Sequence, residues 1–219
     1  MRVFMRANRE RMRDCSALIV IFAKAPQAGR VKTRLAGTLG EEGAARLHAR
    51  LVERTVRMAL AADCGPVELH GAPASHSFLR ALARRHALTL RSQGKGDVGK
   101  RMYEAFRHGL RTHRRMLLIG SDCPAMSAAD LRLATRLLRG CDAVLTPAED
   151  GGYPLIGLAR NSPSLFDGVA WSTSKVMAQT RARLTRLGWR WRELRTLWDI
   201  DRPADLVRLK ASWLLGRRP

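Results

Sequence analysis

Short apolar runs alternate with longer amphipathic segments along almost the whole chain. The runs predict strands at residues 17–23, 66–71, 88–92, 115–120, 142–146, 153–158 and 189–195. The longer segments predict helices at about residues 41–62, 75–86, 99–112, 174–187 and 204–214, and "SAAD" at 127–130 is a capping box that starts another. This alternation is typical of an α/β protein. We therefore expect a single-domain, three-layer α/β/α fold around a mostly parallel mixed sheet.

The chain of 219 residues is most economically one domain, which we place at residues 17–219. Residues 1–16 are rich in arginine and lack the apolar stretch of a secretory signal, so we expect a disordered or loosely attached extension. No apolar run approaches the roughly 18 residues that a membrane-spanning helix needs. Four widely spaced cysteines without a CxxC pair favour reduced thiols. The sequence thus predicts a soluble, cytoplasmic protein with no membrane partner.

The formal net charge of +21 is compatible with nucleic-acid binding, because basic side chains neutralise phosphates and release counterions. The arginines are scattered through every segment, however, and the sequence has no zinc-finger pattern, RNP motif or heptad-bearing basic region. An anionic small substrate fits this charge pattern better. Nucleic acid is therefore kept as the weaker alternative.

A basic loop, "AKAPQAGRVKTRL" at 23–35, follows the first apolar run. Lys24, Arg30, Lys32 and Arg34 place four cations around Gly29. The pattern GxxxxGK[ST] of a Walker loop is absent. Arginine nevertheless offers forked donors and lysine a point charge to phosphate oxygens. We expect this loop to bind phosphates, against the alternative of a solvated basic loop.

A glycine-rich turn, "QGKGDVG" at 93–99, follows the third apolar run. Its glycines formally spell GxGxxG, and Asp122 stands at a distance suited to a ribose, so dinucleotide binding is one alternative. The motif follows the third strand rather than the first, and Lys100 and Arg101 occupy positions where small apolar residues are usual. A tight turn capped by Asp97 is the simpler interpretation.

Aspartates that follow apolar runs suggest a metal site. Asp122 ends the strand in "RMLLIGSDCPAM", and ligands of such sheets sit beyond the carboxyl ends of strands. Asp199 and Asp201, in "LWDIDRPADL", project to the same side if that segment is extended. The three could hold a hard divalent ion such as Mg²⁺ and bridge it to phosphates. The alternatives are a turn or cap for Asp122, and solvation or the start of the next helix for the other two.

An acidic turn, Glu149, Asp150, Gly151 and Gly152, joins two predicted strands. It is either ordinary hairpin chemistry or a place where glycines let the backbone approach a ligand while the carboxylates meet a sugar, an acceptor or a metal. The sequence leaves these two interpretations equally weighted.

Six segments resemble one family in order and spacing. They are "VIFAKAPQAGRVKTRLAGTLG", "QGKGDVGKRM", "IGSDCPAM", "PAEDGGYPLIGL", "WSTSKV" and "DIDRPADL". The family is that of the bacterial glycosyltransferase-like proteins called rSAM/selenodomain-associated transferase 1, similar in turn to 2-phospholactate guanylyltransferase. The match runs from about Ala17 to Leu206. It implies the nucleotide-diphospho-sugar transferase (glycosyltransferase A) fold. The sequence departs from the family's usual residues at Thr146 and Pro154, on the acceptor side, and at Arg202, at the cap of the last helix.

The resemblance implies a role for each motif. Phosphate contacts fall on Lys24, Gly29, Arg30, Lys32 and Arg34, with further nucleotide contacts at Gly94, Gly96 and Asp97. It assigns the binding of magnesium (or manganese) to Asp122, Asp199 and Asp201. It assigns acceptor binding to Glu149, Asp150, Gly151 and Gly152, with Ser172 and Thr173 of "WSTSKV". Lys32, Arg34 and Asp122 are the residues expected to act in catalysis.

The expected reaction is attack of a small anionic acceptor on the α-phosphate of a nucleoside triphosphate, with release of pyrophosphate. The close alternative is glycosyl transfer from a nucleotide-diphosphate sugar, and the remote one is a basic nucleic-acid-binding protein. Five tryptophans in the C-terminal third suggest core packing or the interface of a homo-oligomer.

Overall fold

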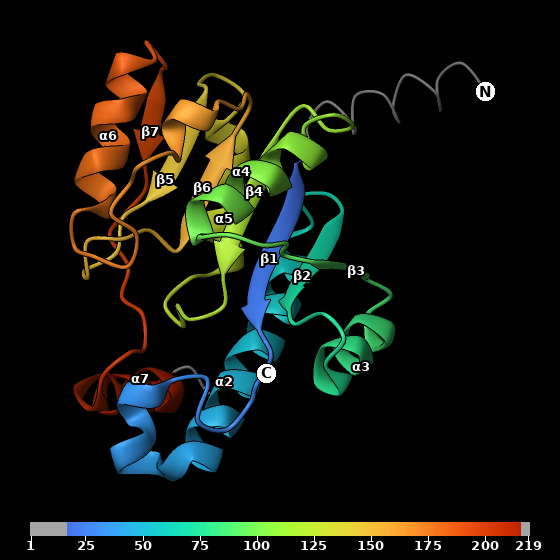
Figure 1. Cartoon of the computed structure of the whole chain (residues 1–219), viewed down its shortest axis with the longest axis vertical. Coiled ribbons are helices and arrows are strands. Elements are labelled where there is room, and N and C mark those ends of the chain that lie inside the picture. Colours follow the sequence, from blue (N-terminus) through green and yellow to red (C-terminus); the bar gives the residue numbers. More distant parts are fainter. Residues whose placement is uncertain (1–16, 216–219) are drawn as a thin grey trace.

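Seven strands form one twisted sheet in the computed structural model, which describes residues 17–215 (Figure 1). In chain order they are β1 (Leu18–Lys24), β2 (Val67–Ala72), β3 (Thr89–Ser92), β4 (Met116–Gly120), β5 (Ala143–Thr146), β6 (Leu155–Leu158) and β7 (Trp191–Glu193). The spatial order is β3-β2-β1-β4-β6-β5-β7. Only β6 runs antiparallel to its neighbours, so the expected mostly parallel mixed sheet is confirmed.

The helices also lie where the apolar periodicity predicts them. They are α2 (Ala36–Ala62), α3 (Ser77–Arg85), α4 (Val98–Gly109), α5 (Ala128–Leu137), α6 (Val176–Arg186) and α7 (Pro203–Leu215), with 3₁₀ turns η1 (Thr33–Leu35) and η2 (Pro163–Leu165). The first of them begins before the expected residue 41, because a turn of helix precedes a kink at Gly40, where φ is +71°. The capping box at Ser127 and Asp130 is formed as predicted.

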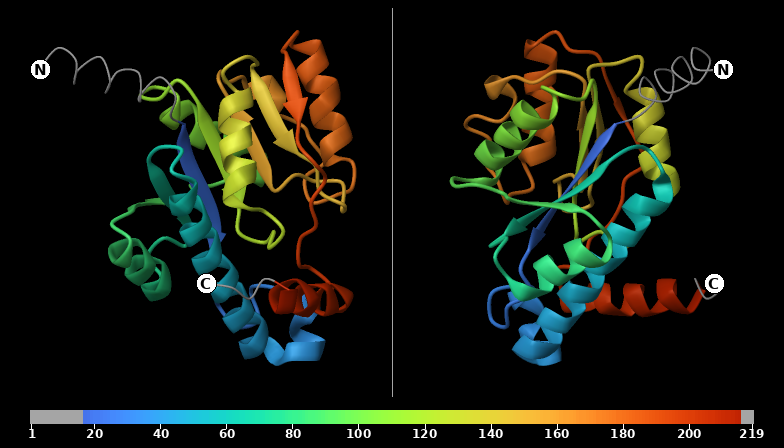
Figure 2. Two further views of the ribbon diagram at one scale, coloured as in Figure 1. Left: turned by 180° about the vertical axis from the view of Figure 1, so that it is seen from behind. Right: turned by 90° about the vertical axis from the view of Figure 1, so that its right-hand side faces the viewer.

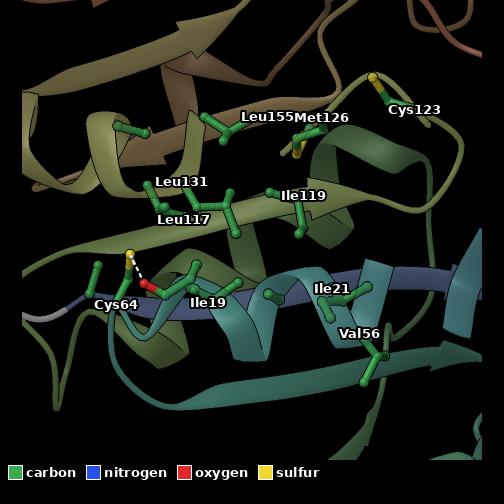
Figure 3. Close-up of a cluster of buried hydrophobic side chains, with 14 of the residues drawn as sticks. Ile19, Ile21, Val56, Cys64, Leu117, Ile119, Cys123, Met126, Leu131 and Leu155 are labelled. Carbon is green, nitrogen blue, oxygen red and sulfur yellow. Dashed lines mark hydrogen bonds between the residues drawn. The ribbon is translucent and has the colours of Figure 1, made fainter. Parts of the chain in front are cut away.

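Helices cover both faces of the sheet (Figure 2). The central strand β1 is buried on both sides because its apolar residues run without alternation. Ile19 and Ile21 face the layer of α2, α3 and α5, where Val56 and Leu131 pack (Figure 3). Leu18 and Val20 lie in a second cluster with residues of α4 and α6. These two cores establish the three-layer α/β/α arrangement.

A third, smaller cluster joins the end of the chain to its beginning. Leu35 of η1 and Leu51 of α2 pack with Ile200 and Leu209. Figure 1 accordingly shows α7 beside the first part of α2, beyond the carboxyl ends of the central strands. The start of α7 is capped by Asp205, whose Oδ2 accepts hydrogen bonds from the backbone of Asp201 and Arg202. The C-terminal segment is therefore held against the basic opening loop.

Three other sequence predictions concern the tryptophans, the N-terminal extension and the absence of a membrane span. Trp189 is a core residue, whereas Trp171, Trp191 and Trp198 are half-buried, and the side chain of Trp213 lies outside the described part. The predicted extension at 1–16 also lies outside it. Within residues 17–215, no helix has the length and apolarity to cross a membrane.

Candidate functional site

The carboxyl ends of β1 and β4 bring the basic loop and the strand-end aspartate to one edge of the sheet. The two strands pair in parallel with Phe22 opposite Gly120, so the loops that follow them are neighbours. The C-terminal segment joins them, because Ile200 donates a backbone hydrogen bond to the Asp122 carbonyl at 3.0 Å. The acidic turn is attached to the same segment by the 3.0 Å bond from the Glu149 backbone N–H to the Leu197 carbonyl. Four segments far apart in sequence thus meet where the sheet topology predicts a ligand.

Asp122 turns one carboxylate oxygen into the protein and leaves the other towards solvent. Its Oδ1 is buried, 2.9 Å from Lys32 Nζ and 3.5 Å from His48 Nδ1. The side chain as a whole is nevertheless 49% exposed, so the exposed area belongs to its other atoms. Partial burial disfavours the charged carboxylate, but the contacts with His48 and Lys32 outweigh it and hold the pKa of Asp122 well below its usual range. Asp122 is therefore a fixed, ionised carboxylate at this edge.

Lys32 is buried, unlike the other cations of the opening loop. Its backbone is left-handed, with φ of +49°, and its side chain is only 6% exposed. The ammonium contacts Asp122 and donates a hydrogen bond to the Ile200 carbonyl. These two contacts use two of the three N–H donors of the ammonium. Lys32 connects the opening loop, β4 and the C-terminal segment, which the sequence did not reveal.

The remaining opening cations divide into one that is paired and two that are not. Arg34 forms an ion pair with Asp201. Lys24 and Arg30 are exposed, and no carboxylate of the described chain pairs with them. Gly29, between the two in the chain, lies in a left-handed turn at φ +71°, where a β-carbon would lie 3.1 Å from the Glu41 carboxylate. Lys24 and Arg30 are consequently exposed cations of the opening loop that have no carboxylate partner in the described chain.

The predicted set of three metal-binding aspartates is not drawn together in the structure. Asp201 is paired with Arg34, and no three His, Cys, Asp or Glu residues within the described chain are grouped closely enough to hold a metal ion. Asp199 lies near enough to other acids that burial, and then the charges of Asp150 and Asp122, raise its pKa to about 6. Mg²⁺ commonly takes only one or two carboxylates, with water and phosphate oxygens as its other ligands. Asp122 and Asp199 are carboxylates of this kind, and metal binding by them, like a role for Asp201, stays a prediction.

The raised pKa of Asp199 predicts a gain in stability when its charge is removed. Between pH 4 and 6 the folded state binds more protons at this carboxyl than the unfolded chain, so stability falls as pH rises through about that window. Asp199→Asn should stabilise the metal-free protein at pH 7.5 by about 1 kcal/mol, after allowance for solvent screening. Melting curves at pH 7.5 and pH 4 with a chelator measure this, and the gain should vanish at the lower pH. A variant less stable than wild type at pH 7.5 would contradict the crowding of carboxylates at this position.

The glycine-rich turn after β3 is the tight, capped turn that the simpler interpretation predicted. Gly94 and Gly96 have φ of +83° and +98°, and Asp97 caps α4 by accepting a 2.8 Å hydrogen bond from the Lys100 backbone. The buried Gln93 before it donates to the carbonyls of Ala23, at 3.2 Å, and His70, at 2.9 Å. Gln93 thus ties the end of β3 to those of β1 and β2. Gln93 is not among the residues that the sequence motifs single out, although it is a lone glutamine between a strand and a glycine turn.

A cavity of about 470 Å³ opens beside this turn, on the α4 side of β2 and β3. Its lining residues are His70, Leu90, Arg91, Ser92, Gln93, Gly94, Glu104, Ala105 and His108. The His70 ring stacks on Phe22 with centroids 5.8 Å apart. Burial lowers the pKa of His70, although Glu68 hydrogen-bonds to it. The cavity combines a ring surface with polar groups and is large enough for a nucleoside-sized ligand.

The acceptor-side residues come together, but one of the carboxylates is occupied. Glu149 is held by both terminal nitrogens of Arg208, at 2.7 and 2.8 Å. Asp150 Oδ1 accepts a 2.8 Å hydrogen bond from Gly152, as in ordinary turns. A β-carbon on Gly151 would lie 2.3 Å from the Ser174 carbonyl oxygen, so this turn packs directly on the segment that carries the exposed Ser172 and Thr173. Close packing on Ser174 therefore accounts for Gly151, and the charge of Asp150 contributes to the raised pKa of Asp199.

Two arginines hold the loop after Asp122 in place, one from the segment after β7 and one from α2; these contacts are called the clasp below. Arg195 forms a fork with Asp130 through contacts of 3.0 and 2.9 Å and also donates to the Ala125 carbonyl at 3.1 Å. Arg54 of α2 donates to the Met126 carbonyl in the same loop, at 3.2 Å. Burial raises the pKa of the Asp130 carboxyl, but Arg195 and Ser127 outweigh that effect and leave it lowered. This clasp fixes residues 123–130 and hence Asp122.

Arg195→Ala should destabilise the fold by about 1–2 kcal/mol, because it leaves the largely buried Asp130 carboxylate without its charged partner. Since the folded-state pKa of Asp130 is lowered, the contribution is present at neutral pH and is lost as pH falls through that pKa. Urea unfolding at pH 7 and at pH 3 measures both values. Arg192→Ala is the control on the neighbouring strand, and an equal loss in both variants would argue against the clasp.

More than half of the chain, residues 55–173, matches the model of the family DUF2064, which is described as an uncharacterized protein conserved in bacteria. A search of curated proteins found no match. A solved structure from Desulfovibrio desulfuricans G20, described provisionally as a nucleotide-diphospho-sugar transferase, is 28% identical, with a TM-score of 0.78 and coverage of 85% of this chain and 82% of that one.

Two more distant structures share the fold. CMP:2-keto-3-deoxy-manno-octonic acid synthetase, solved with CTP, has a TM-score of 0.59 at 12% identity and covers 91% of this chain and 99% of that one. Glucosyl-3-phosphoglycerate synthase from Mycobacterium tuberculosis, solved with Mn²⁺, UDP and glucosyl-3-phosphoglycerate, has a TM-score of 0.55 at 9% identity, covering 94% and 81%. The fold is that of nucleotidyltransferases and glycosyltransferases, as the sequence predicts.

Proposed function

Since the chain belongs to the DUF2064 family, we propose that it is a Mg²⁺- or Mn²⁺-dependent transferase that moves a nucleotidyl group from a nucleoside triphosphate to a small anionic acceptor. The observation that carries this proposal is Asp122, an ionised carboxylate fixed at the sheet edge with one oxygen turned outward, beside a loop that presents Lys24 and Arg30 to solvent. A carboxylate and unpaired cations at the same edge of the sheet suit a ligand that is both metal-bound and strongly anionic. A triphosphate has that chemistry.

The nucleoside would lie at the cavity beside β3, and the phosphates would reach towards the opening loop. Gln93 supports this arrangement, because it lines the cavity and holds the end of β1 through the Ala23 carbonyl. The glycines at 94 and 96 let the turn approach a ligand closely. Nucleoside binding in this cavity is part of the proposal. If it is correct, the affinity of the protein for nucleoside triphosphates should depend on the base.

Catalysis would consist mainly of positioning and charge neutralisation. Asp122 and Asp199 would hold the divalent ion, which when bound neutralises phosphate oxygens. Lys24 and Arg30 would bind the departing pyrophosphate, and Lys32 would hold the inner oxygen of Asp122 in place. An acceptor oxygen entering from the side of Asp150 would form a bond to the α-phosphorus while the bond to the pyrophosphate oxygen breaks, so the electron pair leaves with pyrophosphate.

Glycosyl transfer is the second candidate. The 28%-identical Desulfovibrio protein is described as a nucleotide-diphospho-sugar transferase, and this agrees with the resemblance to rSAM/selenodomain-associated transferase 1. In that reaction the same aspartates would hold the metal on the leaving diphosphate, and Asp150 would meet the acceptor. The two reactions differ in the donor. A basic nucleic-acid-binding role, suggested by the charge of +21, is the third and weakest candidate.

The donor identifies itself in a thermal-shift screen of the four nucleoside triphosphates and a panel of nucleotide-diphosphate sugars, each with and without Mg²⁺. A ligand that binds the folded state raises the melting temperature by mass action. We expect one triphosphate to stabilise the protein, and only when the metal is present. Stabilisation by a diphosphate sugar alone would replace the proposal by glycosyl transfer. Failure of both classes, with salt-sensitive binding of DNA or RNA, would replace it by the third candidate.

A further inference from the structure

A buried histidine lies directly beneath the candidate site and was not among the residues that the sequence singled out. His48 is on α2, and its side chain is 4% exposed. Its Nε2 lies 3.0 Å from the Lys24 carbonyl oxygen, and its Nδ1 lies 3.5 Å from Asp122 Oδ1. One ring therefore contacts the ends of both β1 and β4, the two strands whose loops build the site.

The chemistry of these contacts determines what the ring does. The Lys24 carbonyl oxygen can only accept a hydrogen bond, so Nε2 must carry a hydrogen to donate there. The opposite nitrogen, Nδ1, faces the buried carboxylate oxygen that Lys32 also contacts, and this 3.5 Å contact is an ion pair rather than a hydrogen bond, attractive when Nδ1 carries a hydrogen as well. Because the ring and Lys32 both face Oδ1, the other oxygen of Asp122 is the one left on the ligand side.

We propose that His48 is a positioning residue, whose imidazole fixes the inner oxygen of Asp122 relative to the Lys24 backbone and so orients the outer oxygen towards the divalent ion. This inference rests on the proposed function, because it concerns the same metal and nucleotide. Residues that orient a ligating carboxylate in this way typically change metal affinity or activity by about 10- to 100-fold when they are replaced. The role is distinct from catalysis, since His48 is buried and would act through Asp122.

Two amide substitutions separate the two contacts of the ring. In His48→Asn the side-chain amide nitrogen takes the place of Nδ1, so the contact with Asp122 is kept and that with Lys24 is lost. In His48→Gln the amide nitrogen takes the place of Nε2, so the contact with Lys24 is kept and that with Asp122 is lost. Val56→Ala, a fully buried position two turns further along α2, reports the effect of a core defect alone.

The measurement is Mn²⁺ affinity, obtained from the electron paramagnetic resonance signal of free Mn²⁺, with and without the triphosphate that stabilises wild type most. His48→Gln should weaken Mn²⁺ binding about 10-fold or more. His48→Asn should keep it within about 3-fold, a small fraction of the loss expected when the contact is broken. Val56→Ala should lower the melting temperature and leave Mn²⁺ affinity unchanged.

Each other outcome counts against a specific statement. Wild-type affinity in His48→Gln overturns the positioning role while leaving the proposed function intact. An equal loss in both His48 variants and in Val56→Ala also overturns it, because a packing defect would then explain the effect. A wild-type protein that binds neither Mn²⁺ nor any nucleotide overturns the proposed function itself, and the role of His48 with it.

Discussion

Asp122→Asn should lower turnover by about 100-fold or more while the protein stays folded. The asparagine keeps the shape of the side chain, and its amide oxygen can still accept from Lys32, but the negative charge that would hold the divalent ion is gone. The Asp122 side chain is 49% exposed, and its outer carboxylate oxygen is the part available to a ligand. The measurement is release of pyrophosphate from the triphosphate identified by thermal shift, at saturating and limiting Mg²⁺.

Asp201→Asn is the informative comparison for Asp122→Asn. The two aspartates were assigned to one metal set by the sequence, but the structure pairs Asp201 with Arg34. The Asp201 variant should therefore lose less than about 10-fold, the size expected when an exposed ion pair is removed rather than a ligand. Equal losses in the two variants would restore Asp201 to the metal site, and full activity in Asp122→Asn would remove the basis of the proposed function.

The order of strands and helices was predictable because each element carries a local signal. β1 reads as five apolar residues in succession and is buried on both faces, and the capping box at Ser127 marks the start of α5. The edge where the ligand should bind was predictable as well, since parallel strands place their carboxyl ends together. This rule alone brings Asp122 and the basic loop to one edge of the sheet.

The roles of individual side chains were less accessible, because they depend on contacts between distant residues. Nothing near Lys32 in the sequence distinguishes it from Lys24 or Arg30, yet a left-handed backbone at Lys32 turns its side chain inward, while the other two stay exposed. His48 has the context of an ordinary amphipathic helix, and its partners are 24 residues away at Lys24 and across the site at Asp122. Pairing across such separations follows only from the tertiary fold.

The Asp-x-Asp pair illustrates the same limit from the other side. Alternation in an extended segment places Asp199 and Asp201 on one side, which supports a shared metal. In the structure Arg34 of η1 pairs with Asp201. Asp199 instead lies within electrostatic reach of Asp150 and Asp122. The competing cation came from the opening loop, about which the local alternation rule says nothing.

Lys32→Met should also lower turnover by about 100-fold, a loss comparable to removing one well-placed charged donor. Methionine fills nearly the same volume without a charge, so the packing of the buried stem is kept. The inner oxygen of Asp122 and the carbonyl of Ile200 both lose their cation, and the C-terminal segment loses one attachment to the site. Because Asp122 is partly solvated, we expect a stability loss of about 1–2 kcal/mol, smaller than for a fully buried pair.

Arg30→Ala separates the positional role of Lys32 from a simple loss of positive charge. Arg30 is exposed on the same loop, and the described chain offers it no acidic partner, so its removal takes away one cation without disturbing Asp122. It should raise KM for the nucleotide several-fold and leave kcat within about 3-fold, since a cation that binds donor and transition state alike contributes uniform binding. Lys32→Met should instead lower kcat. If both variants alter only KM, then Lys32 acts as one more phosphate cation, and its burial against Asp122 has no part in the chemistry.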